Sequence, residues 1–385
     1  MGNLPQSMQK HQHAVGRLNF TQTLLGGQHM HSSFGNNLKL TIYGASHDTK
    51  IGMTLEGIPA GLPVDMAQLQ NFLNRRAPGQ NPWSTTRKEA DTPHFLSGIT
   101  ADVTNGDTIE AVIYNENIRK SDYDKLKHIP RPGHADYTAW AKYGLDFDMS
   151  GGGPFSGRLT APICIAGGLC KQWLEANGIR IGAHIAWIHD IDDNRFDPMH
   201  PDLNAIHQDF PVINRVCGEQ MQEAILDTQK NGDSVGGIIE CAAVGMPQGL
   251  GAHLFGGIES HISQITYGIP AVKGVDFGLG FASIYHPGSY CNDPFVIADG
   301  KIQTATNHCG GVLGGITTGM PLIFRVAIKP TPSIAKPQKS VNMKTMEEVT
   351  IQIQGRHDPC IVPRAVPVVE AAAAIAIYDL LLENR

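Results

Sequence analysis

The sequence predicts an α+β fold in which strands and helices are mixed without regular alternation. Apolar residues alternate with period two, as in strands, at 38–44 and 51–57. Helical stripes and helix-length apolar runs stand between the expected strands and at the end of the chain. Because strand and helix do not succeed one another in a fixed order, the pattern favours α+β over a doubly wound parallel sheet.

The first half of the chain is expected to form three strands and three helices. The strands are expected at 38–44, 51–57 and 108–115. Asp65 precedes an apolar helical stripe that ends near Arg76. A short helix is expected over 134–143, after a Pro-Gly break, and a longer apolar helix over 159–175, closed by Asn177 and Gly178.

The second half continues the mixture of strands and helices. Strands are expected at 179–188, 235–245 and 321–328, and a helix at 219–230. Pro367 is expected to open a final Ala-rich helix through Leu382, because proline is favoured in the first helical turn. Residues 1–31 are polar and lack periodicity, so we expect a disordered extension followed by a single catalytic domain at 32–385.

Composition and charge exclude several classes of protein. Among 385 residues, 17% are charged and the formal net charge is -6, which does not favour nucleic-acid binding. The longest apolar run, 367–382, carries two acidic residues, so no membrane partner is expected. The seven cysteines include no CxxC pair, which fits a reducing cytoplasm better than a disulfide framework or zinc finger. The N-terminus has no apolar signal core, so secretion is not expected.

The common short catalytic motifs are absent from the sequence. It contains no GxxxxGK[ST], no GxGxxG and no HExxH, so Walker-type phosphate binding, ordinary dinucleotide binding and zinc hydrolysis lack their signatures. The segment GASHD at 44–48 approaches the GxSxG nucleophile elbow of serine hydrolases but lacks the last glycine.

Short segments of glycine and polar residues recur where strands or helices are expected to end. Glycine lets backbone N–H groups approach an anion closely, and basic or hydroxyl side chains complete such a site. Two histidines and a carboxylate among these segments would suit an anionic substrate undergoing proton transfer. A single glycine-rich loop is usually only a turn, however, and a lone histidine is more often structural. These patterns alone predict an enzyme with anion-binding loops and do not identify the reaction. The segments are 44–47, 131–136, 151–158, 307–311, 329–333 and 355–359.

Across most of its length the sequence resembles the chorismate synthase family. The resemblance rests on ordered blocks that include RRAPGQN (75–81), RPGHADYTAWAKYG (131–144), PAVKGV (270–275), NHCGGVLGGITTGMP (307–321), KPTPSI (329–334) and GRHDPCIVPRAVPVVEA (355–371). The resemblance implies a sandwich of antiparallel sheets around a helical layer, assembled as a homotetramer.

The resemblance also implies the reaction and its cofactor. Members of the family eliminate phosphate from the small-molecule substrate 5-enolpyruvylshikimate 3-phosphate to give chorismate. They require reduced FMN, although the reaction has no net redox change, and NADPH serves only to reduce the flavin. The cofactor carries the difficult chemistry while the protein orients and charges the site.

Catalytic positions carry over one by one. His47 matches a family histidine that protonates the departing phosphate, and His134 matches one that supplies or positions a proton at the flavin. Asp358 matches an aspartate that assists proton removal. Ser46 and Ser156 match serines of the same proton relay.

Binding positions carry over in the same way. Arginine suits phosphate and carboxylate because its guanidinium offers two parallel donors. Arg76 and Arg158 match family positions that bind the substrate anions. Arg356 matches a position that belongs to both the substrate-binding and the FMN-binding sets. Positions matching FMN-binding residues of the family are Ala271, Gly314, Lys329, Pro330, Thr331, Pro332 and Ser333.

One catalytic loop departs from the family pattern. The usual GESHG reads GASHD here, so Ala45 replaces a glutamate and Asp48 adds a negative charge beside His47. This departure leaves an alternative open, a flavin- or ligand-binding relative with impaired catalysis. A plain NADPH-dependent oxidoreductase is a third hypothesis, which the missing dinucleotide fingerprint disfavours.

Overall fold

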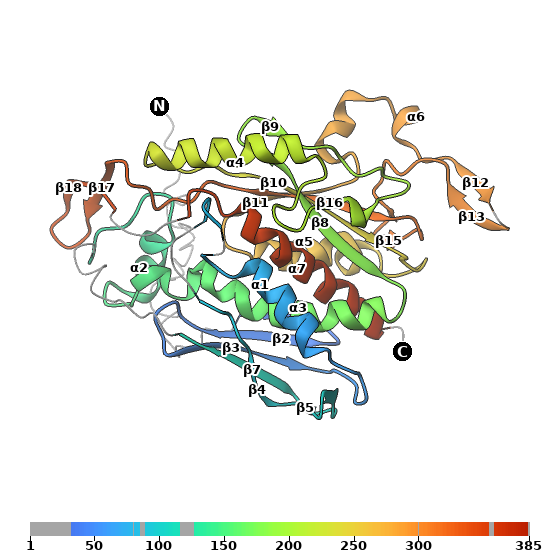
Figure 1. The fold of residues 1–385 in the computed structure, drawn as a ribbon, viewed down its shortest axis with the longest axis horizontal. Helices are drawn as coiled ribbons and strands as arrows, with labels where there is room; N and C mark the ends of the chain where they lie inside the picture. The colour runs from blue at the N-terminus through green and yellow to red at the C-terminus, as the bar shows by residue number, and fades with distance from the viewer. Residues whose placement is uncertain are drawn as a thin grey trace, which may run out of the picture.

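Two antiparallel sheets enclose a layer of helices (Figure 1). The computed structural model describes residues 32–79, 81–84, 89–115, 127–298, 300–353 and 358–383. In this part of the chain each of the two main sheets has five strands, which confirms the α+β class and the sandwich architecture. The expected N-terminal extension, 1–31, lies outside the described residues.

The first sheet has the strand order β1-β2-β3-β7-β4, and every neighbouring pair is antiparallel. Its strands are β1 (Ser32–Phe34), β2 (Lys39–Gly44), β3 (Lys50–Glu56), β7 (Ile109–Tyr114) and β4 (His94–Ser97). The second sheet has the order β11-β16-β10-β8-β9 and is also antiparallel. Its strands are β11 (Val272–Phe277), β16 (Leu322–Ile328), β10 (Gly237–Val244), β8 (Arg180–Ile188) and β9 (Ile191–Asp192).

Four helices form the layer between the sheets: α1 (Met66–Arg76), α3 (Thr160–Glu175), α5 (Ile258–Tyr267) and α7 (Val362–Glu383). Helices α2 (Asp136–Tyr143), α4 (Arg215–Lys230) and the short α6 (Gly288–Cys291) lie outside that layer (Figure 1). The remaining strands form two-stranded ribbons: β5 (Ile99–Thr100) with β6 (Val103–Thr104), β12 (Phe295–Ala298) with β13 (Lys301–Thr304), β14 (Val312–Leu313) with β15 (Ile316–Thr317), and β17 (Gln338–Asn342) with β18 (Glu347–Ile351).

Local sequence explains where the helices begin. The side chain of Asp65 accepts a hydrogen bond from the Gln68 backbone N–H at 2.9 Å, so α1 starts directly after it, as predicted. Helix α4 starts four residues before the expected 219, because Asn214 caps it by accepting from the Val216 N–H at 3.0 Å. The prediction that Pro367 opens the last helix is wrong, since α7 begins at Val362 and contains Pro367 in its second turn.

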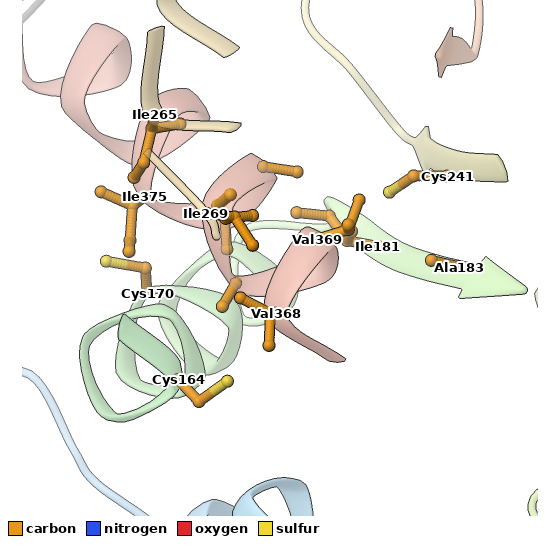
Figure 2. Close-up of a cluster of buried hydrophobic side chains, with 14 of the residues drawn as sticks. Cys164, Cys170, Ile181, Ala183, Cys241, Ile265, Ile269, Val368, Val369 and Ile375 are labelled. Atoms are coloured by element: carbon orange, nitrogen blue, oxygen red, sulfur yellow. The ribbon is translucent and has the colours of Figure 1, made fainter. Parts of the chain in front are cut away.

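Helix α7 forms the centre of the hydrophobic core. Its sequence is apolar on all sides, which is typical of a fully enclosed helix. Gly167 of α3 allows the two helices to touch, because a Cβ atom there would lie 2.2 Å from the Ala371 Cβ. Figure 2 shows this region, where side chains of α3, α7, β8, β10 and the end of α5 meet, among them Cys164, Cys170, Ile181, Ala183, Cys241, Ile265, Ile269, Val368, Val369 and Ile375.

Two buried carboxylates in α7 fasten the surrounding elements to it. Glu370 accepts two hydrogen bonds from Arg75 of α1, at 2.7 and 2.9 Å, and pairs with Lys171 of α3. Burial alone would raise the pKa of Glu370, but these two cations outweigh it and lower the pKa to about 2. The carboxylate therefore remains ionised, and α1, α3 and α7 are held in register.

Asp379 fastens the N-terminal strand region to the end of α7. Its carboxylate accepts from the backbone N–H groups of Asn36, Asn37 and Leu38 at 2.7–2.9 Å and from His261 Nε2 at 2.7 Å. Burial would raise the pKa of Asp379, but these donors outweigh it and lower the pKa. Helix α7 is also long and apolar enough to span a membrane by composition alone, yet here most of it is buried between the sheets.

Candidate active site

A cavity of about 980 Å³ opens at one end of the sandwich, where the ends of several elements meet. The end of β2, the C-terminal ends of α1 and α5, and the first residues of α3 and α7 all line it. The N-terminus of a helix presents free N–H groups and a partial positive charge. The starts of α3 and α7 therefore favour a negatively charged ligand in this cavity.

A glycine-rich segment, η2 (Ser150–Phe155), passes between the two predicted catalytic histidines. Gly151, Gly152 and Gly153 have φ angles of 61°, 93° and 53°, a left-handed conformation that side chains disfavour. A Cβ on Gly151 would lie 2.3 Å from the His47 ring, and one on Gly152 would lie 3.2 Å from the His134 ring. Glycine is required here because both imidazoles pack against the backbone.

The two predicted serines also lie at this segment. The Ser46 backbone N–H donates to the Gly153 carbonyl at 3.1 Å, which ties the loop that carries His47 to η2. Ser156 lines the cavity, and its hydroxyl accepts from the Arg158 N–H at 3.3 Å. Ser46 and His47 are buried, with 2% and 8% of their surfaces exposed, so the structure places them in the wall behind η2.

Arg76 and Arg158 lie together in the cavity wall and share one buried carboxylate. Asp91 forms ion pairs with both guanidinium groups, and Glu89 lies 3.0 Å from Arg158 Nε. Burial would raise the pKa of Asp91, but the two arginines outweigh it and lower the pKa. Thr160 accepts from Arg76 Nε at 3.1 Å, which further orients that side chain. Two guanidinium groups in one wall form a site suited to phosphate or carboxylate.

Asp358 lies just before the N-terminus of α7, beside another arginine, Arg364. Both Asp358 and Arg364 line the cavity and form an ion pair, and Arg364 Nε donates to the Arg76 carbonyl at 3.1 Å. Burial lowers the pKa of Arg364, while Asp358 opposes that effect. The arrangement places the Asp358 carboxylate in the cavity lining, linked through Arg364 to the end of α1.

Another part of the cavity wall is basic and comes from the chain after α5 and after β16. Ala271, Lys273, Lys329 and Thr331 line it, together with Pro332 and Ser333. Burial, and then the nearby charge of Lys273, lower the pKa of Lys329. Within the described part of the chain the Thr331 hydroxyl is buried and has no hydrogen-bond partner. A basic wall with a spare hydroxyl donor suits a phosphate monoester.

Two of the predicted FMN-binding positions in the described part of the chain do not line the cavity, Pro330 and Gly314. Pro330 follows Lys329 but is exposed and does not line it. Gly314 lies in the β14–β15 turn, and the adjacent Gly315 carbonyl accepts from the N–H of Ile258, the first residue of α5. The cavity lies at the other end of this 10-residue helix, about 15 Å away at 1.5 Å per residue. Arg356 lies outside the described residues.

The sequence interpretation missed several residues of the site. Arg131 and Asp136 flank His134 within the RPGHAD block, and their proximity in sequence could have indicated contact. Arg364 lies within the block 355–371 but was not assigned a role, and Glu89 and Asp91 belong to none of the blocks, so only folding brings them to the arginine pair.

The unusual Asp48 does not enter the cavity. Asp48 is exposed, its backbone carbonyl accepts from the Asn115 side chain at 2.8 Å, and it is not among the residues that line the cavity. The alternative of a relative with catalysis impaired by GASHD therefore has no support.

Fold and site together define a class of protein, an enzyme that binds a small polyanion and transfers protons to or from it. The chain also matches the family model described as chorismate synthase over residues 38–382. This chain belongs to the chorismate synthase family.

Individual relatives agree with this assignment. The chain is 46% identical to a chorismate synthase of Lancefieldella parvula, covering 91% of this chain and 96% of that protein. It is 44% identical to one of Thermococcus kodakarensis, covering 91% and 98%. A solved structure titled "Crystal Structure of Chorismate Synthase" superposes with a TM-score of 0.73 at 28% identity, covering 91% of this chain and 93% of that one.

Proposed function

We propose that this protein is a carbon–oxygen lyase that eliminates phosphate from 5-enolpyruvylshikimate 3-phosphate to give chorismate, an anti-1,4-elimination of the shikimate pathway. The observation that carries the proposal is the cavity itself, since its lining gathers His134, Asp358, Arg76 and Arg158 from distant parts of the chain, and His47 packs behind Gly151 of the same wall. In this proposal residues 32–385 act as one catalytic domain, which the hydrophobic core shared by both sheets supports.

The arginine pair binds the anionic groups of the substrate. Arg76 and Arg158 place two guanidinium groups in one wall of the cavity, and Asp91, which pairs with both, keeps their mutual repulsion low. The N-termini of α3 and α7 add a favourable field at the same place. A substrate with one phosphate and two carboxylates offers anionic partners both to these guanidinium groups and to the helix N-termini.

The side chains of His47, His134 and Asp358 take part in proton transfer. His47 protonates the departing phosphate, because a protonated phosphate leaves more readily than the dianion. The η2 backbone fixes its ring at van der Waals contact, so the donor needs no reorganisation at the moment of reaction. Asp358 assists the removal of the substrate proton, and Ser46 and Ser156 act in the same relay.

Reduced FMN fits the basic wall. Lys273, Lys329 and the Thr331 hydroxyl would hold its phosphate, and Ala271, whose φ is 74°, lines the same part of the cavity. A cavity of about 980 Å³ is at the upper end of the usual range of small-molecule sites, about 300–1,000 Å³, and has room for two ligands. When bound, the reduced flavin supplies the electron density that weakens the bond to the leaving phosphate. NADPH is needed only to reduce it.

We further propose a homotetramer in the cytoplasm. The segment that carries α6, β12 and β13 projects from the sandwich (Figure 1). Four large apolar side chains of residues 281–297 and a fifth from the turn before α5 are 76–91% exposed, as expected of surfaces covered by a second copy. The set is Phe255, Phe281, Ile284, Tyr285 and Ile297. All seven cysteines have free thiols, which supports a reducing compartment. Ile297→Asp should lower the mass measured by analytical ultracentrifugation, and an unchanged mass would contradict this surface.

An anaerobic assay tests the reaction. The protein is mixed with 5-enolpyruvylshikimate 3-phosphate and either chemically reduced or oxidised FMN, and phosphate and chorismate are measured together. We expect equal amounts of both products with reduced FMN and none with oxidised FMN. Product formation with oxidised FMN, or phosphate without chorismate, would contradict the proposal.

A further inference from the structure

The loop that carries His134 contains a buried ion pair directly behind the imidazole. Asp136 is 2% exposed and Arg131 is 5% exposed. Arg131 donates to the Asp136 carboxylate from Nε at 2.7 Å, from the second guanidinium nitrogen, Nη2, at 2.8 Å, and from its backbone N–H at 2.9 Å. The carboxylate is thus held rigidly, with one oxygen, Oδ1, left to face the ring of His134.

The contacts of the His134 ring define which nitrogen carries the proton in the neutral imidazole. Nδ1 lies 2.9 Å from Asp136 Oδ1 and 3.2 Å from Arg131 Nη2. Nη2 already donates to Oδ1 at the shorter distance of 2.8 Å, so it is engaged with the carboxylate. Oδ1 can only accept, and Nδ1–H is therefore the donor in the closer contact.

The opposite edge of the ring faces the cavity. A Cβ built on Gly152 would lie 3.2 Å from both Cε1 and Nε2 of His134, so this edge packs on η2, which ends just before Ser156. His134 itself lines the cavity, with 15% of its side chain exposed. With Nδ1 engaged, Nε2 is the nitrogen directed at bound ligands.

The charges around His134 are balanced by the same contacts. Burial would raise the pKa of Asp136, but hydrogen bonds from Arg131 and His134 outweigh it and hold the pKa well below its usual range. Asp136 therefore stays ionised, and Arg131 neutralises it. From the loop after β16, the Lys329 ammonium donates to the Gly133 carbonyl next to His134. The imidazole thus lies beside an ion pair and one further cation.

We infer that Asp136 is a positioning residue for His134, which holds the Nδ1–H tautomer and so makes Nε2 the nitrogen that exchanges protons in the cavity. Only the expected effect on kcat rests on the proposed function. When His134 is protonated, the proton on Nε2 passes to the acceptor in the cavity. The proton on Nδ1 stays hydrogen-bonded to Asp136, which is not itself protonated.

The tautomer can be observed directly by NMR of protein labelled with ¹⁵N-histidine. His134→Gln identifies the His134 signals by their disappearance. At a pH where the ring is neutral, we expect a protonated Nδ1 and a bare Nε2 in the wild-type protein. In Asp136→Asn we expect a mixture of tautomers, because an amide can either accept a hydrogen bond from Nδ1–H or donate one to a bare Nδ1. We also expect kcat to fall about 10- to 100-fold, the size of effect seen when the carboxylate partner of a metal-bound histidine is removed, with KM changed much less.

A matched control exists on the surface. His189 Nδ1 lies 2.6 Å from Asp190 Oδ1, but these side chains are 57% and 79% exposed and stand outside the cavity. Asp190→Asn should leave both kcat and the His134 signals unchanged. A loss of kcat in this control would show that the assay does not isolate the buried pair.

Three results would overturn the inference. They are an Nε2–H tautomer in the wild-type protein, an unchanged tautomer in Asp136→Asn, and a changed tautomer with full kcat. The wild-type spectrum is decisive by itself, so the inference is testable even where the variant does not fold. The spectrum is recorded without substrate, so failure of the proposed reaction would appear as absent product with the tautomer intact.

Discussion

Gly151→Ala changes the contact that positions His47. The new Cβ would lie 2.3 Å from both Cδ2 and Nε2 of the ring and 2.9 Å from the Ser46 Oγ, whereas ordinary contact begins at 3.4 Å. Either the ring or η2 must therefore move by about 1 Å. His47 has little room to yield, since it is 8% exposed and its neighbour Ser46 is hydrogen-bonded to Gly153.

Two effects determine the size of the change. The left-handed φ of 61° at Gly151 costs a residue with a Cβ about 1–2 kcal/mol. Overpacking adds about 1–3 kcal/mol. The free energy of unfolding should fall by about 2–5 kcal/mol, the sum of these two ranges. A displacement of 1 Å in a catalytic group lowers kcat/KM by about 10²-fold.

Gly178→Ala separates the two effects. Gly178 has a comparable φ of 82°, but a Cβ there meets nothing within 4 Å, and the residue lies at the α3–β8 turn away from the cavity. This variant should lose about 1–2 kcal/mol of stability and keep full activity. Urea unfolding and anaerobic turnover measure both quantities. Full activity in Gly151→Ala, or an equal loss in Gly178→Ala, would refute the claim that η2 positions His47.

Three further predictions concern the site and the core. His47→Ala and His134→Ala should each lower kcat about 10²-fold or more at an unchanged melting temperature, and unaltered turnover in both would exclude them as proton donors. Asp91→Asn leaves two buried guanidinium groups without their shared counterion and should lower the free energy of unfolding by about 3–5 kcal/mol. Inorganic phosphate should then raise the melting temperature of this variant more than that of the wild type, and equal shifts would argue against an anion site. Glu370, with its folded-state pKa lowered from 4.5 to about 2, stabilises the fold fully above pH 4.5 and loses this effect as pH falls toward 2. The stability advantage of wild type over Glu370→Gln should therefore narrow across that range, and a constant difference would contradict the ion pairs.

The elements of the fold were largely readable from apolar periodicity and capping residues. Strands β2, β3, β8, β10 and β16 and helices α1 and α3 lie where the sequence predicted them. The start of α7 was missed, because Pro367 was interpreted as a first-turn residue, while burial on all sides sustains the helix through it. The close contact of Gly167 with Ala371 has no signal in either segment alone.

The site was predictable only where its residues belong to recognisable blocks. His47, His134, Arg76, Arg158 and Asp358 follow from the family resemblance, and the structure brings them to one cavity or its wall. The partners that control their charge and orientation depend on tertiary contacts. Asp91 meets Arg76 and Arg158 across gaps of 15 and 67 residues, which no spacing rule anticipates.

The central claim is that this cavity carries out an elimination in which the flavin is not consumed. The most direct test is an anaerobic count of chorismate formed when reduced FMN is limiting and no NADPH is present. Many molecules of chorismate for each molecule of FMN are expected, because the residues of the cavity move protons and anions while the flavin ends each cycle reduced. One molecule of chorismate per FMN would contradict the account and favour an oxidoreductase.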